Sequence, residues 1–202
     1  MSKKQINNSS SDKYIQDYLD TASLVISQLN KQDIEKVITK LIYLKENKGR
    51  LFLLGVGGSA ANCSHAVNDF RKIAGIEAYS PTDNIAEITA RTNDDGWETV
   101  FINWLKVSKL NKNDAVMILS VGGGNIEKNT SINIVRALEY AKEVKTLILG
   151  IVSKDGGFTK KMSAVCLMIP VIKDEFVTPF AESLQALIWH LIINHPKLKD
   201  HF

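Results

Sequence analysis

The chain has 202 residues, of which 45% are hydrophobic and 23% charged, as is ordinary for a globular α/β domain. Its 25 basic and 22 acidic residues give a net charge of +3, and the basic residues form no cluster, which argues against nucleic acid as a partner. There is no run of about 18 apolar residues, so we expect no membrane span.

The cysteines and the first residues favour a cytoplasmic location. Cys63 and Cys166 show neither a CxxC spacing nor a Cys/His zinc spacing, which is typical of a reducing compartment. Residues 1–11 are polar and lack the apolar stretch of a signal peptide. We expect a mobile tail over residues 1–11 and a single domain over residues 12–202.

Two amphipathic helices are predicted at the start of this domain. Apolar residues recur at helical spacing from Ile15 to Leu29 and again from Ile34 to Leu44. We expect these helices to form an N-terminal extension that packs against the rest of the fold or against another subunit.

Strands and helices alternate along the rest of the chain. Apolar runs predict buried strands at 50–54, 115–119 and 146–152, with shorter strands at 77–80 and 165–169. Helices are predicted at 59–74, from Asn84, at 130–142, at 158–164, and from Thr178-Pro179 to about Asn194. This order predicts a doubly wound α/β fold with a five-stranded, mostly parallel sheet.

Two glycine-rich loops follow strands of this sheet, at the edge where such folds bind ligands. Glycines and a helix start suit an anion, so both loops together could hold one phosphate. The alternatives are a tight turn that needs glycine for geometry in loop 55–61, and a flexible connection in loop 120–125. The phosphate-binding candidates are Gly57, Gly58, Ser59, Ser120, Gly122, Gly123, Gly124 and Asn125.

Two pairs of polar residues have spacings that place each pair on one side of a helix. His65 and Asp69 are four residues apart, and Glu182 and His190 are eight apart. Imidazole and carboxylate groups suit a metal site or acid–base catalysis. The alternatives are a solvated polar pair at His65 and Asp69, a helix-dipole partner at Glu182, and a core residue at His190.

Two further positions are candidates for substrate binding. Gln185 is one turn from Glu182 and is either a substrate contact or a helix surface residue. Asp94 lies in the stretch 92–96, whose carboxylates could bind sugar hydroxyls. The alternative for that stretch is a helix that ends at Gly96.

The first loop and the helix after it resemble the sugar isomerase (SIS) domain family, and within it the D-sedoheptulose 7-phosphate (phosphoheptose) isomerases. That family typically shows GNGGSAADAQHFAAEL where this chain has GVGGSAANCSHAVNDF over residues 55–70. Further similarity is found at Thr82-Asp83, Asn93-Asp94-Asp95-Gly96, Asp155-Gly156-Gly157 and the segment from Thr178 to His190. The resemblance covers residues 12–195.

The resemblance implies a flavodoxin-like SIS fold, a homo-oligomer that is most commonly a tetramer, and an aldose–ketose isomerase that acts on a phosphorylated sugar. The leading reaction is conversion of sedoheptulose 7-phosphate to D-glycero-D-manno-heptose 7-phosphate. Asp69 would be the base and His190 the second acid–base group. Zinc in some members implies a metal shell of His65, Asp69, Glu182 and His190.

The chain departs from the family pattern at several site positions. Asp69 and Glu182 stand where the family has Glu and Gln, and Val56 replaces an Asn. The second loop reads SVGGGN in place of STSGNS and extends through Thr130. These departures keep open an alternative function, a non-catalytic SIS protein that senses a sugar phosphate or binds a protein partner.

Overall fold

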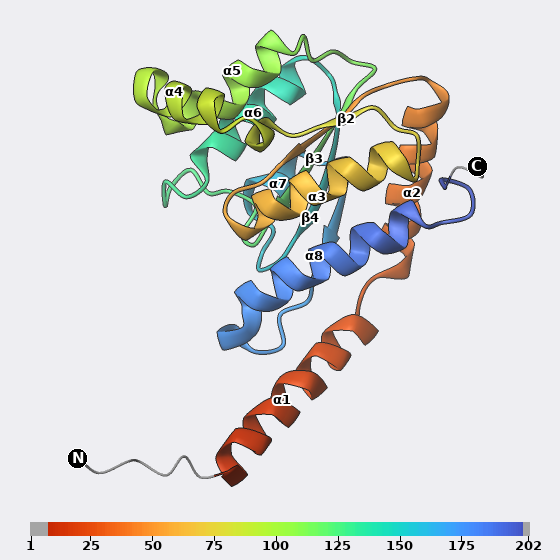
Figure 1. Cartoon of the computed structure of the whole chain (residues 1–202), viewed down its shortest axis with the longest axis vertical. Helices are drawn as coiled ribbons and strands as arrows, with labels where there is room; N and C mark the ends of the chain where they lie inside the picture. Colours follow the sequence, from red (N-terminus) through yellow and green to blue (C-terminus); the bar gives the residue numbers. More distant parts are fainter. Residues whose placement is uncertain (1–7, 200–202) are drawn as a thin grey trace.

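Five parallel strands form the centre of the protein (Figure 1). The computed structural model describes residues 8–199. The strands are ordered β2 (Ala78–Tyr79), β1 (Leu51–Leu54), β3 (Ala115–Ser120), β4 (Leu147–Val152) and β5 (Val165–Met168). Every neighbouring pair is parallel, which confirms the predicted doubly wound sheet.

Helices cover both faces of the sheet because side chains alternate between the faces along each strand. Leu51, Leu53 and Met117 contact one layer, which consists of α2 (Lys31–Glu46), α3 (Gly58–Lys72) and α8 (Val177–Ile193). Phe52, Leu54 and Val116 contact the other layer. That layer contains α5 (Val100–Val107), α6 (Ile132–Glu143) and α7 (Gly157–Met162), with α4 (Ile85–Asp95) at its edge.

Helix boundaries agree with the sequence at the start of α4 and differ at the start of α8. The Asn84 side chain accepts hydrogen bonds from the N–H groups of Ala86 and Glu87, so α4 begins as predicted. Helix α8 begins at Val177 after a 3-10 turn at Asp174–Phe176, and Thr178 does not cap it. Pro179 is still within the first turn, where its missing N–H leaves no hydrogen bond unmade.

Helix α1 (Asn8–Ser27) extends away from the sheet (Figure 1). It begins inside the predicted tail, and residues 1–7 of that tail lie outside the described residues. Tyr18 packs against Phe176 and Phe180, and Asp17 pairs with Lys173. The exposed side of the helix carries large apolar residues, namely Tyr14, Ile15, Leu19, Leu24 and Ile26.

One segment has the length and composition of a membrane helix. Asp174–Ile193 is long and apolar enough to cross a membrane, but 56% of its most apolar 18-residue window is buried inside the protein. Its residues Leu184, Ile188 and Trp189 belong to the core under the sheet. The apolar character of α8 is therefore explained by packing.

An ion pair joins the starts of β1 and β3. Arg50 donates to the Asp114 carboxylate through its backbone N–H, Nε and Nη2, and Asp114 has a side-chain exposure of 2%. The carboxylate also accepts two hydrogen bonds from Asn111. Hydrogen bonding to Asp114 raises the pKa of Arg50 further above its usual value, so the guanidinium stays charged.

Replacing Asp114 should destabilise the fold because it leaves Arg50 without its counter-charge. We expect Asp114→Ala to lower the free energy of unfolding by about 3–5 kcal/mol, measured by urea denaturation. The matched control is Glu139→Ala, which breaks an exposed pair with Arg136 and should cost less than about 0.5 kcal/mol. Equal effects of the two substitutions would contradict this.

Candidate active site

The first glycine-rich loop joins β1 to α3, and two of its glycines, Gly55 and Gly57, are required by geometry. A Cβ at Gly55 would lie 2.6 Å from the Ser59 carbonyl oxygen, and Gly57 has a φ of 62°. A Cβ at Gly58 would lie 2.5 Å from the Glu182 carboxyl group. The loop thus brings the start of α3 close to α8, and Ser59 occupies the first turn.

The second glycine-rich loop packs against the turn between β4 and α7. Gly123 has a φ of 72°, and a Cβ there would lie 2.0 Å from the Gly156 carbonyl oxygen. Its own carbonyl accepts from the N–H and the hydroxyl of Thr159, both at 2.8 Å. Its N–H donates to the Ser120 hydroxyl oxygen at 3.0 Å. Gly123 therefore has a structural role, and its N–H is not available to a phosphate.

The extension of the second loop forms an ordered hairpin, which we call the inserted hairpin (residues 125–130). Asn125 and Thr130 exchange backbone hydrogen bonds of 2.9 and 3.0 Å. The Asn125 side-chain oxygen accepts from the Lys128 N–H at 2.8 Å, so this predicted phosphate ligand supports the turn. These hydrogen bonds give residues 125–130 a defined turn, in contrast to the flexible connection that was the alternative for the second loop.

A pocket of about 490 Å³ lies between the two loops, and we call it the loop pocket. Five of the predicted phosphate ligands line it, namely Ser59, Ser120, Gly122, Gly124 and Asn125. Gly57, Gly58 and Gly123 shape the loops and do not line the pocket. Sequence reasoning missed several polar lining residues, namely Lys128, Thr130, Ser131, Lys154 and Thr178. The extension of the second loop through Thr130 was the feature of the sequence that could have identified Lys128.

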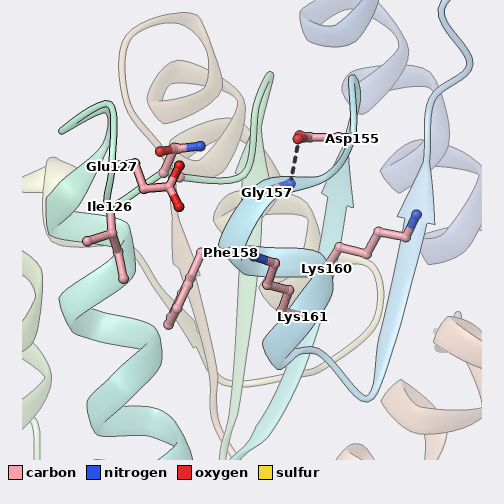
Figure 2. A pocket seen from close by; sticks show the side chains of 9 residues that line it. Ile126, Glu127, Asp155, Gly157, Phe158, Lys160 and Lys161 are labelled. Atoms are coloured by element: carbon pink, nitrogen blue, oxygen red, sulfur yellow. Dashed lines mark hydrogen bonds between the residues drawn. The ribbon is translucent and has the colours of Figure 1, made fainter.

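A second hollow of about 510 Å³ lies on the other side of the inserted hairpin. Figure 2 shows Ile126 and Glu127 of the hairpin across from Phe158 of α7. The Asp155 carboxylate accepts a hydrogen bond from the Gly157 N–H, which is the dashed line in Figure 2. No predicted acid–base residue lines this hollow.

Helices α3 and α8 lie side by side and run in the same direction (Figure 1). Gly58 faces Glu182 at one end. Two turns further along α3, the His65 ring meets the Trp189 ring with centroids 4.7 Å apart. Residues that advance along α3 therefore meet residues that advance along α8, and His190 of the second predicted pair comes close to His65 and Asp69.

His65, Asp69 and His190 form a cluster at the far end of this helix pair, which we call the triad. The Asp69 Oδ2 lies 3.6 Å from His65 Nε2 and 3.5 Å from His190 Nε2. All three ligand atoms lie within 4.8 Å of one another, so the triad could hold a metal ion. The Asp69 side chain is 12% exposed, whereas the His65 and His190 side chains are 57% and 43% exposed, so the triad is open to solvent.

Neighbouring groups orient the triad. Asn68 donates to Asp69 Oδ1 at 2.7 Å, which leaves Oδ2 facing the imidazoles. The His190 Nδ1 lies 2.8 Å from the Ala186 carbonyl oxygen, which can only accept, so Nδ1 donates. The His190 Nε2 then faces Asp69, in the arrangement typical of metal-binding histidines.

Glu182 does not join the triad, contrary to the expected shell of four residues. It lies eight residues before His190, and a helix rises about 12 Å over eight residues. Its carboxyl group lies against Gly58 instead.

Gln185 and Asp94 also lie away from the triad and the loop pocket. Gln185 is fully buried, and its side-chain oxygen accepts from Asn62 of α3 at 3.0 Å, so it is a helix–helix contact. Asp94 is in the last turn of α4 and accepts a hydrogen bond from neighbouring Asn93. Gly96 follows with a φ of 84° and ends the helix, as the structural alternative for this stretch predicted.

Comparison with known proteins places this geometry in a family. Residues 13–153 match the SIS domain. The phosphoheptose isomerase of Helicobacter pylori strain 26695 is 28% identical over 167 residues, which cover 80% of this chain and 81% of that protein. The fold is shared with the phosphoheptose isomerase of Neisseria gonorrhoeae, with a TM-score of 0.78 and 19% identity over 91% of this chain and 96% of that protein. It is also shared with a phosphoheptose isomerase of Francisella tularensis, with a TM-score of 0.72 and 21% identity over 96% of this chain and 97% of that protein. The match over more than half of its length shows that the chain belongs to the SIS domain family.

Proposed function

We propose that the protein is an aldose–ketose isomerase that converts sedoheptulose 7-phosphate to D-glycero-D-manno-heptose 7-phosphate. The observation that carries this proposal is the convergence of His65, Asp69 and His190 on the helix pair that starts at the loop pocket. The names of the relatives in Helicobacter, Neisseria and Francisella support the same reaction.

The loop pocket binds the phosphate in this proposal. Ser59 and Ser120 each contribute a hydroxyl group to it, and Gly122 and Gly124 line it with backbone atoms. Binding at a phosphate remote from the reacting carbons supplies positioning energy for the chemical step.

The triad carries the proton transfer. The Asp69 carboxylate, oriented by the Asn68 hydrogen bond, takes a proton from the carbon next to the carbonyl. The resulting enediol is reprotonated at the neighbouring carbon, and His190 moves the proton between the substrate oxygens. The family resemblance implies these two roles, and the contact of 3.5 Å between Asp69 Oδ2 and His190 Nε2 supports them.

The triad also suits one zinc ion. Two ligand atoms that are each about 2.1 Å from a tetrahedral zinc lie about 3.4 Å apart, close to the two separations at Asp69 Oδ2. Two imidazoles and one carboxylate form a known catalytic zinc set that leaves one position open. When bound, zinc supplies polarisation of the substrate carbonyl.

Zinc binding should depend on the triad and less on Glu182. We expect His190→Ala and Asp69→Ala each to weaken zinc binding more than about 100-fold, measured by calorimetry with a competing chelator. Glu182→Gln should weaken zinc binding less than either of these two substitutions. The control is His195→Ala, because His195 lies beyond the end of α8. The zinc affinity of this variant should equal that of the natural protein. Unchanged affinity in His190→Ala would exclude the triad as the metal site.

Asp69→Asn should abolish isomerisation without loss of the fold, because an amide cannot accept the proton. Conversion of sedoheptulose 7-phosphate followed by NMR measures the activity, and circular dichroism measures the fold. Asp20→Asn on α1 is the control with normal activity. If the zinc-loaded protein binds ketose 7-phosphates but converts none, the non-catalytic alternative replaces this proposal.

We further propose a cytoplasmic homotetramer. Apolar residues of α1, together with Leu187 and Leu191 on α8, leave exposed surface that a second copy would cover. Light scattering should give four chains of 22.5 kDa, about 90 kDa. Leu19→Asp should lower this mass, whereas Val107→Asp at the exposed end of α5 should not. A monomer at micromolar concentration would contradict the proposal.

A further inference from the structure

Two lysines that take no part in the proposed chemistry line the loop pocket. Lys128 is on the inserted hairpin, and Lys154 follows β4. They come from separate segments of the chain, 26 positions apart, and reach the same pocket as Ser59 and Ser120.

Neither lysine has an ion-pair partner among residues 8–199. Some other cations among the described residues are paired with carboxylates, namely in Arg50–Asp114, Arg91–Glu87, Arg136–Glu139, Lys36–Asp33 and Lys173–Asp17. Asp155 is the acidic residue that lines the loop pocket, and its carboxylate accepts from the Gly157 N–H. The pocket therefore carries an excess of positive charge.

The backbone around the pocket adopts conformations that side-chain-bearing residues rarely take. Lys48, Lys109 and Lys145 have positive φ angles at the ends of helices, where such angles are common. Three other residues with positive φ angles lie at or beside the loop pocket, namely Asn129, Ser131 and Lys154, with φ of 48°, 49° and 52°. Strained backbone of this kind gathers at binding sites.

Contacts with the loops hold both lysines at the pocket. The Lys128 N–H donates to the Asn125 side chain, which fixes the hairpin turn. The Lys154 stem lies over Gly122, with its Cδ 3.9 Å from where a Cβ of Gly122 would be. A larger residue at position 122 would take the space next to this stem.

Hydroxyl groups alone would neutralise little of a phosphate's charge. Ser59 is 2% exposed, and the Ser120 oxygen already accepts from Gly123. A phosphate monoester carries about −1.5 to −2 charges near pH 7, and cations form its strongest hydrogen bonds.

We propose that Lys128 and Lys154 bind the phosphate group and select phosphorylated over neutral sugars. This inference rests on the assignment of the loop pocket to a phosphorylated sugar. The two lysines are specificity residues, and the triad remains the site of chemistry.

The test compares Lys128→Gln, Lys154→Gln and the double variant with Lys161→Gln, which removes an exposed charge that lines only the second hollow. Calorimetry with inorganic phosphate measures binding at low and at high salt. We expect each single variant to bind phosphate about tenfold more weakly, the double variant to lose salt dependence, and Lys161→Gln to match the natural protein. Lys128→Arg should restore most of the affinity.

Kinetics with sedoheptulose 7-phosphate separates this inference from the proposed function. The KM of the lysine variants should rise by more than kcat falls, which a merely structural role would not produce. Normal phosphate affinity and KM in the folded double variant would overturn the inference and leave the isomerase proposal intact. Lysine-dependent phosphate binding in a protein that converts no sugar phosphate would support the inference and overturn the isomerase proposal.

Discussion

The contact between α3 and α8 is the constraint on which the rest of the site depends. The two helices pack in the same direction on one face of the sheet, so each turn of α3 meets a matching turn of α8. Gly58 permits the close approach at one end, and Asn62 bridges the middle by donating to the Glu182 carbonyl and the Gln185 side chain. His65 and Asp69 meet His190 only because this register is kept.

Much of this arrangement could be predicted from the sequence. Buried strands and glycine-rich loops have local signals, so the five-stranded parallel sheet, the placement of both loops at one edge and the start of α4 could be predicted from patterns of residues. The helical spacing of His65 and Asp69 also placed them on one side of α3. The spacing of residues could not predict which turn of α8 packs against which turn of α3. Glu182 and His190 share a side of one helix, but only His190 lies level with the triad.

The second glycine-rich loop shows another limit of prediction from sequence patterns. A run of glycines indicates conformational freedom of the backbone or anion binding. It does not reveal which glycine is needed for close packing between backbone segments. Gly123 and Gly157 let the second loop touch the turn before α7, where a Cβ on Gly157 would lie 2.3 Å from the Gly122 carbonyl oxygen. Long-range contact between two loops decides their roles, and no local pattern encodes it.

In the proposed function, the helix pair also sets how far the phosphate must lie from the reacting carbon. From Ser59 in the first turn of α3 to His65 and to Asp69 in the triad there are six and ten residues, rises of about 9 and about 15 Å. A sugar held by its phosphate at the loop pocket would have to extend along α3 to bring its carbonyl carbon to the triad. The proposed site would therefore favour sugars whose phosphate is far from the carbonyl over triose or tetrose phosphates.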